Sequence, residues 1–307
     1  MNILSLFDGI SCGMTALLRA GIPVDNYIAY EIDKYAIQTS EKNYPQIIRR
    51  GNVFDGGFSD FRDADLLIGG SPCTYWSIAK RNRETDCGGE GFRLFMQYVR
   101  ALEETRARYF LYENNYSVHQ NIKDEISKKL GVQPIMINSA LVCAQQRKRC
   151  YWTNIPNVTQ PADKGILLKD IIDNAVPWQG KSYCLTANYG SATLKNTLER
   201  HQRTMVAEPV RIGDIGSNSQ GHRVYSVHGK SITLSANGGG QGGTTGLYKI
   251  DLPDGNYLIR KLSPVECERL QTLPDNYTQG VSNAQRYKQL GNGWTVDVIV
   301  HILGGLL

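Results

Sequence analysis

Short apolar runs alternate with longer amphipathic segments along the first half of the chain. The apolar runs predict buried strands at 2–7, 27–31, 65–68 and 109–113. The amphipathic segments predict helices at 13–20, 33–44, 92–106 and 119–130. This alternation predicts an α/β fold, in which helices cover both faces of a parallel sheet. Ligands of such sheets bind beyond the C-terminal ends of the strands.

The pattern changes after about residue 173. Thirteen of the 31 glycines fall within 175–255, and this segment carries three of the five histidines. Within it, KSYCLTAN (181–188) and KSITLSAN (230–237) echo each other, which is too little for a repeat protein. The segment predicts a loop-rich β subdomain with two similar hairpins, or a surface whose polar loops contact a ligand. A helix-like apolar pattern returns at Arg260 and continues to Leu307.

The composition is that of a globular protein, with 41% hydrophobic and 21% charged residues. No apolar run approaches the roughly 20 residues needed to cross a bilayer, and the N-terminus lacks the basic flank of a signal peptide. The seven cysteines stand singly, without the close spacing of a zinc site. We therefore expect free thiols, no metal and a reducing compartment. A net charge of +5 is compatible with a polyanionic partner but does not establish one.

The turns after the first two predicted strands could form a ligand site. FDGISCG (7–13) joins the first strand to the first helix. Its glycines permit close approach of a ligand to the backbone, and the helix N-terminus offers free N–H groups. Glu31 ends the second strand, where a carboxylate can hydrogen-bond a ribose diol. A solvent-exposed surface glutamate is the alternative interpretation.

Two further strand ends carry groups suited to catalysis. GGSPC (69–73) follows the third strand and places Cys73 after a proline in a turn, where a thiol can be exposed and activated by nearby positive charge. Glu113 ends the next strand and is a candidate acid. QQRKR (145–149) puts Arg147 and Arg149 at alternate positions, which share one face of a strand. Alone, such a charged run indicates only a solvated face.

Taken in order, these motifs resemble those of the cytosine-5 DNA methyltransferases, which use S-adenosylmethionine. The shared elements are SLFDGISCG, Glu31, GGSPC, Glu113-Asn114, Gln145-x-Arg147-x-Arg149, RKLSPVECERLQTLP (260–274) and LGNG (290–293). The likeness extends over essentially the whole chain, and its first motifs look most like the de novo branch and related phage or bacterial enzymes. It implies a Rossmann-like methyltransferase domain with a smaller target-recognition domain.

The resemblance implies a role for each matching residue. The residues implied to bind S-adenosylmethionine are Phe7, Asp8, Gly9, Gly13, Glu31, Ile32, Asn52, Val53, Pro72, Asn292 and Gly293. Cys73 is implied to be the nucleophile, and Glu113 to engage the cytosine ring nitrogen. Arg149 is implied to donate to the ring carbonyl, and Arg147 to make a phosphate or support contact.

The resemblance also implies the partner and the layout of the domains. Residues 1–172, completed by 259–307, would form the catalytic domain, and 173–258 the target-recognition domain. The expected substrate is a cytosine flipped out of double-stranded DNA, with no membrane or metal involved. The residues expected to contact DNA are Lys80, Arg81, Arg83, Asn188 and Asn237. We expect a monomer in the cytoplasm of a bacterium or of a phage-infected cell.

Some residues depart from the family pattern, and three other functions stay open. Asn52 stands where aspartate is common, and Asn115 where valine is usual. The alternatives are a tRNA cytosine-5 methyltransferase, a catalytically inactive DNA-binding homologue and a nicotinamide-dependent oxidoreductase. Retention of Cys73 and Glu113 argues against an inactive homologue. The oxidoreductase is weakest, because the glycine spacing does not match G-x-G-x-x-G.

Overall fold

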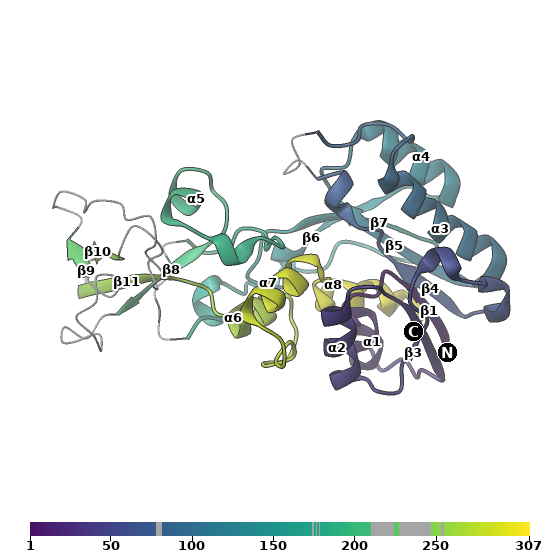
Figure 1. The fold of residues 1–307 in the computed structure, drawn as a ribbon, viewed down its shortest axis with the longest axis horizontal. Coiled ribbons are helices and arrows are strands. Elements are labelled where there is room, and N and C mark those ends of the chain that lie inside the picture. The colour runs from purple at the N-terminus through teal and green to yellow at the C-terminus, as the bar shows by residue number, and fades with distance from the viewer. Residues whose placement is uncertain are drawn as a thin grey trace.

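The computed structural model of the chain describes residues 1–77, 82–173, 175, 177, 179–209, 224–226, 247–252 and 255–307. These residues form a sheet of seven strands and a sheet of four strands. Figure 1 shows the two sheets lying apart along the long axis of the molecule. Of the helices within these residues, none is both long and apolar enough to cross a lipid bilayer.

The larger sheet is mostly parallel, which confirms the predicted α/β fold. Its strand order is β3-β2-β1-β4-β5-β7-β6. The predicted strands are present as β1 (Asn2–Leu6), β2 (Asn26–Tyr30), β4 (Leu66–Gly69) and β5 (Tyr109–Asn115). The others are β3 (Ile48–Arg49), β6 (Ile135–Asn138) and β7 (Lys148–Thr153), of which β7 runs antiparallel to both β5 and β6. The strand order reverses between β1 and β4, the position at which open sheets bind ligands.

The predicted helices are present, with ends that differ by one or two residues. They are α1 (Cys12–Arg19), α2 (Lys34–Asn43), α3 (Glu90–Thr105) and α4 (Gln120–Leu130). Asp33 and His119, predicted as first helical residues, instead cap α2 and α4. Asp33 Oδ1 accepts hydrogen bonds from the backbone N–H groups of Tyr35 and Ala36, which have no partner within the helix.

Alternate residues of the central strands belong to different hydrophobic cores. In β4, Leu66 and Ile68 join the core that α1 and α8 (Val296–Leu303) cover, whereas Leu67 joins the core beneath α3 and α4. Period-two alternation with both faces apolar is what a doubly covered sheet requires. Each fully buried side chain of this kind contributes about 1.5–3 kcal/mol of transfer free energy.

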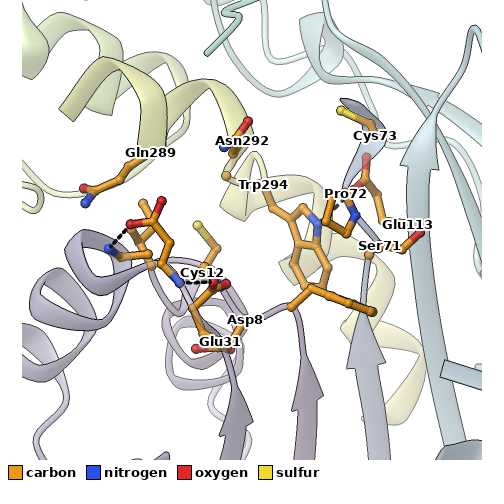
Figure 2. Close-up of a pocket in the computed structure, with 18 of the residues that line it drawn as sticks. Asp8, Cys12, Glu31, Ser71, Pro72, Cys73, Glu113, Gln289, Asn292 and Trp294 are labelled. Atoms are coloured by element: carbon orange, nitrogen blue, oxygen red, sulfur yellow. Dashed lines mark hydrogen bonds between the residues drawn. The ribbon is translucent and has the colours of Figure 1, made fainter. Parts of the chain in front are cut away.

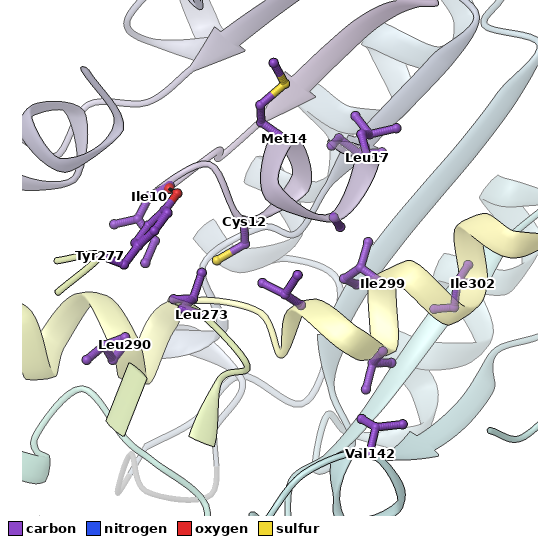
Figure 3. Close-up of a cluster of buried hydrophobic side chains, with 14 of the residues drawn as sticks. Ile10, Cys12, Met14, Leu17, Val142, Leu273, Tyr277, Leu290, Ile299 and Ile302 are labelled. Carbon is purple, nitrogen blue, oxygen red and sulfur yellow. Dashed lines mark hydrogen bonds between the residues drawn. The ribbon is translucent and has the colours of Figure 1, made fainter. Parts of the chain in front are cut away.

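The C-terminal segment returns to the large sheet. It forms α6 (Pro264–Leu270), α7 (Asn283–Asn292) and α8. Figure 3 shows Ile299 and Ile302 of α8 in one cluster with Leu17 of α1 and Val142. This packing supports the proposed completion of the catalytic domain by residues 259–307, which stays a prediction. The helical pattern starts at α6 rather than at Arg260, because Arg260 belongs to a strand and Ser263 caps α6.

The smaller sheet lies mostly within the predicted target-recognition segment. Its order is β8-β11-β10-β9, from β8 (Met205–Pro209), β9 (Val224–Ser226), β10 (Leu247–Leu252) and β11 (Gly255–Lys261). A short helix, α5 (Leu194–Leu198), precedes it. The predicted hairpin at 181–188 is wrong: Ser182 forms an isolated bridge with Gln145, because its backbone pairs with Ala144 and Gln146. Residues 230–237 lie outside the described residues.

Gly291 fixes the contact between α7 and the segment at 186–187. A Cβ at this position would overlap the backbone of Thr186 and Ala187, which cannot move aside as a side-chain end can. We therefore predict that Gly291→Ala lowers the free energy of unfolding by about 1–3 kcal/mol, measured by urea denaturation. Gly304→Ala is the matched control, because a Cβ there meets nothing within 4 Å. Equal effects of the two substitutions would contradict this account.

Candidate active site

A cavity lies at the C-terminal ends of β1, β4 and β5, beside the end of α7 (Figure 2). Twelve of the fifteen residues predicted for catalysis or cofactor binding, which were chosen from distant parts of the sequence, line it. They are Phe7, Asp8, Gly9, Gly13, Glu31, Pro72, Cys73, Glu113, Arg147, Arg149, Asn292 and Gly293. Pro72 and Cys73 lie in the turn that follows β4. The fold therefore brings the two predicted groups of residues together at one site.

The turn after β1 has an unusual backbone. Phe7, Gly9 and Ser11 all have positive φ angles, of 56°, 59° and 60°. This region is easily reached by glycine and disfavoured for phenylalanine, so the surroundings must hold the turn in place. A Cβ on Gly9 would meet nothing within 4 Å, so the backbone there borders open space. The turn can therefore admit a ligand against its main chain.

Asp8 holds this turn together from inside. Its carboxylate accepts hydrogen bonds from the hydroxyls of Ser5 at 2.6 Å, Tyr27 at 2.7 Å and Ser11 at 2.5 Å. Burial raises the pKa of Asp8, whereas these three hydrogen bonds oppose the rise. Because the hydroxyls occupy both oxygens, Asp8 acts mainly as a support for the turn.

Glu31 is fixed at the cavity wall by backbone N–H groups. Oε2 accepts from Gly9 N at 2.8 Å, and Oε1 accepts from the N–H groups of Ile32 and Asp33, also at 2.8 Å. Burial raises the pKa of Glu31, and the hydrogen bonds oppose the rise. Oε2 accepts only one hydrogen bond and retains capacity for another, so Glu31 can still accept from a ligand hydroxyl.

The turn that carries Cys73 is tied to β5. Ser71 Oγ lies 2.6 Å from the Tyr112 hydroxyl, and Asn114 Nδ2 donates to the Ser71 carbonyl at 3.1 Å. Cys73 begins a short 3₁₀ turn and is partly exposed at the cavity. Burial raises the pKa of the Cys73 thiol, whereas the positive charge of Arg149 lowers it. The thiol is therefore the resting form, and Arg149 is placed to favour the thiolate.

Glu113 is held between two donors. Arg149 Nε lies 3.0 Å from Oε1, in a salt bridge whose side chains are only 13% and 12% exposed. Trp294 Nε1 donates to Oε2 at 3.0 Å. In Figure 2 the indole stands between the group around Asp8 and Glu31 and the group around Pro72 and Glu113. Trp294 was not among the residues predicted from the sequence, although it directly follows the LGNG motif.

Arg147 is a support contact. Its guanidinium is buried and donates to three backbone carbonyls, those of Leu185 at 3.0 Å, Gly291 at 3.1 Å and Gly293 at 2.9 Å. A side chain only 3% exposed cannot reach a phosphate on a duplex, so of the two predicted roles the structure favours support. Arg147 thereby joins β7, the segment at 185 and the end of α7.

Cys184, which was not predicted as a site residue, also contacts Arg147 and Arg149. The guanidinium nitrogens Arg147 Nη1 and Arg149 Nη2 lie 3.5 Å and 3.9 Å from its sulfur. Burial alone would raise the pKa of Cys184, but the two arginines lower it below the ordinary value. The arginines at alternate positions thus do face the same way, as their spacing predicted. No signal in the sequence links Cys184 to them.

Several predicted residues lie away from the cavity lining. Ile32 is 72% exposed beside Glu31, Val53 is buried in a core, and Asn52 caps the turn at Val53–Asp55. Arg83 donates to the Ser117 carbonyl at 2.6 Å, and Asn188 is exposed at the start of a 3₁₀ turn. Lys80, Arg81 and Asn237 lie outside the described residues. Within the described residues, no group of three or more His, Cys, Asp or Glu could hold a metal ion.

Known proteins share both this sequence pattern and this fold. The C-5 cytosine-specific DNA methylase family matches residues 1–307. Type II methyltransferase M.HhaI of Haemophilus parahaemolyticus is 27% identical, over 98% of this chain and 93% of that protein. Orphan methyltransferase M.Rho11sI of Bacillus phage rho11s is 26% identical, over 82% of this chain and 61% of that protein.

Among solved structures, the Entamoeba histolytica methyltransferase EhMeth shares the fold, with a TM-score of 0.63 at 16% identity over 100% of this chain and 97% of that one. The resemblance drawn from the motifs is thus confirmed over the full length. The chain belongs to the C-5 cytosine-specific DNA methylase family and is a DNA (cytosine-5)-methyltransferase.

Proposed function

We propose that the cavity binds S-adenosylmethionine beside β1 and β2, and a cytosine flipped out of double-stranded DNA beside β4 and β5. One observation carries the proposal: Cys73, Glu113 and Arg149 line the same cavity as Gly9 and Glu31. A methyl transfer needs both reactants in contact, so both must enter one space. A base stacked in a duplex cannot reach Cys73, so the base must flip.

The residues beside β1 and β2 suit the cofactor. Glu31 can accept a hydrogen bond from a ribose hydroxyl, and the backbone at Gly9 is open to the methionine end. Phe7 lines the cavity, and Ile32 exposes 72% of its surface next to Glu31. An adenine ring that covers these apolar side chains would remove their surface from water. When bound, S-adenosylmethionine supplies the electrophilic methyl group.

The residues beside β4 and β5 suit the chemistry of the base. Carbon-5 of cytosine is a poor nucleophile until another nucleophile adds to carbon-6. In the proposed reaction the Cys73 thiolate forms a bond to carbon-6, while Glu113 engages the ring nitrogen and Arg149 donates to the ring carbonyl. Electron density then reaches carbon-5, which would take the methyl group as the sulfur–methyl bond of the cofactor breaks and S-adenosylhomocysteine is released. Loss of the carbon-5 proton to a base expels the thiolate and completes the cycle.

Cys73 can be tested by covalent trapping. A duplex with 5-fluorocytosine at the target cannot lose a proton from carbon-5, so the adduct should persist when S-adenosylmethionine is present. We predict trapping by the wild type and by Cys87→Ala, and none by Cys73→Ala, read on a denaturing gel. Full methylation by Cys73→Ala would show the proposed mechanism to be wrong. A tRNA transcript with the same base is the counter-substrate, and its preferential trapping would favour RNA.

Glu31 can be tested by calorimetry with S-adenosylhomocysteine. A hydrogen bond to a charged group is worth about 1.5–3 kcal/mol, so Glu31→Ala should weaken binding about ten- to a hundred-fold. Glu41→Ala is the matched control, because Glu41 is exposed on α2 and does not line the cavity. Equal affinities of the two variants would exclude Glu31 from the cofactor site.

Trp294 can be tested with the conservative change Trp294→Phe. The ring stays aromatic, but the donor to Glu113 Oε2 is lost. We predict that kcat falls about ten- to a hundred-fold, because a misaligned Glu113 engages the base poorly. Trp152→Phe is the control, since its indole bonds Ser127 away from the cavity. If both variants keep wild-type kcat, the hydrogen bond to Glu113 has no part in the reaction.

A further inference from the structure

Two lysines converge on one exposed tyrosine just outside the cavity. Lys123 Nζ lies 4.6 Å from the centre of the Tyr116 ring, and Lys148 Nζ lies 5.8 Å from it. Tyr116 is 45% exposed. We name Tyr116, Lys123 and Lys148 the tyrosine–lysine cluster. Cation–π attraction holds the ammonium groups over the ring, but it leaves their positive charge in place.

The charge of the cluster is not neutralised within the described part of the chain, where no carboxylate forms an ion pair with Lys123 or Lys148. The nearest acids along α4 have other partners. Asp124 accepts from Gln120 at 2.7 Å, and Glu125 lies 3.6 Å from Lys128. Two like charges held near each other repel, and a bound anion would relieve that repulsion.

The cluster adjoins the base side of the cavity. Asn115, the last residue of β5, pairs with Arg149 of β7. One step further toward the sheet edge, Tyr116 follows Asn115, and Lys148 precedes Arg149. Arg83, from the segment after the nucleophile, donates to the carbonyl of Ser117 beside Tyr116. Successive strand residues point to opposite faces, so Lys148 faces away from the Glu113–Arg149 pair. The cluster therefore lies at the same edge of the sheet as the cavity, within one residue of Arg149 along β7, on the opposite face of the sheet.

We propose that Lys123 and Lys148 bind backbone phosphates of the DNA strand that carries the flipped cytosine, with Tyr116 holding both ammonium groups in place. This inference rests on the proposed function. A flipped nucleotide stays joined to its strand, so the flanking phosphates must pass close to the mouth of the cavity. Lysine is a compact point charge that suits a phosphate oxygen without reading the base sequence.

The test is the salt dependence of binding to two duplexes of equal length, one with a mapped methylation site and one without. Each phosphate contact contributes about 0.9 to the slope of log K against log salt for B-DNA. We expect Lys123→Gln combined with Lys148→Gln to reduce the slope by about 1.8 on the duplex with the methylation site, where the cytosine flips. Binding to S-adenosylhomocysteine should be unchanged, because neither lysine lines the cavity.

Lys128→Gln combined with Lys129→Gln is the matched control, since it removes two exposed charges from the same helix. The proposal is overturned if the two double variants have equal slopes while both still form the 5-fluorocytosine adduct. The proposed function then stands. A slope reduced only on the duplex without the site would contradict a contact to the strand that carries the flipped cytosine. A wild type that neither binds nor traps duplex DNA would overturn both proposals.

Discussion

The site depends on one buried cation that has no carboxylate partner among the described residues. Arg147 donates to the carbonyls of Leu185, Gly291 and Gly293, which belong to segments far apart in the sequence. A buried guanidinium is costly unless its N–H groups are paired, so these carbonyls must stay in place around it. Because two of these carbonyls belong to Gly291 and Gly293, the end of α7 lies beside the start of β7. Gln271 supports the same peptide, because its side-chain amide donates to the carbonyl of Gly293 at 3.3 Å.

The position of Trp294 follows from that constraint. The residue before it, Gly293, packs against the sulfur of Cys12 at the start of α1, and the Trp294 indole donates to Glu113 at the end of β5. Residues 293–294 therefore contact both sides of the cavity. Arg149 completes the arrangement, because it occupies the other oxygen of Glu113. Glu113 is thus oriented before any base arrives, and electrostatic catalysis depends on such preorganisation.

The sequence predicted the parts of the molecule that depend on local patterns. The four predicted strands of the large sheet are short apolar runs, and the motif residues fall at strand ends, where topology must gather them. The departures from the family pattern also have local roles: Asn52 caps a 3₁₀ turn, and Asn115 accepts from Ser117. The sequence pattern did not predict contacts between residues that are far apart along the chain. Trp294 and Glu113 are 181 residues apart, and Ser182 bridges to Gln145 instead of forming a hairpin.

Two thiols near the same arginines have opposite pKa shifts, and the thiol with the lowered pKa is not the one that lines the cavity. Cys184 contacts both guanidinium groups and its pKa is lowered, yet it does not line the cavity. Cys73 lines the cavity, but burial raises its pKa and Arg149 only partly offsets the rise. If acidity selected the nucleophile, Cys184 would be chosen. Attack requires contact with the substrate, so in the proposed reaction access to the cavity, rather than acidity, selects Cys73.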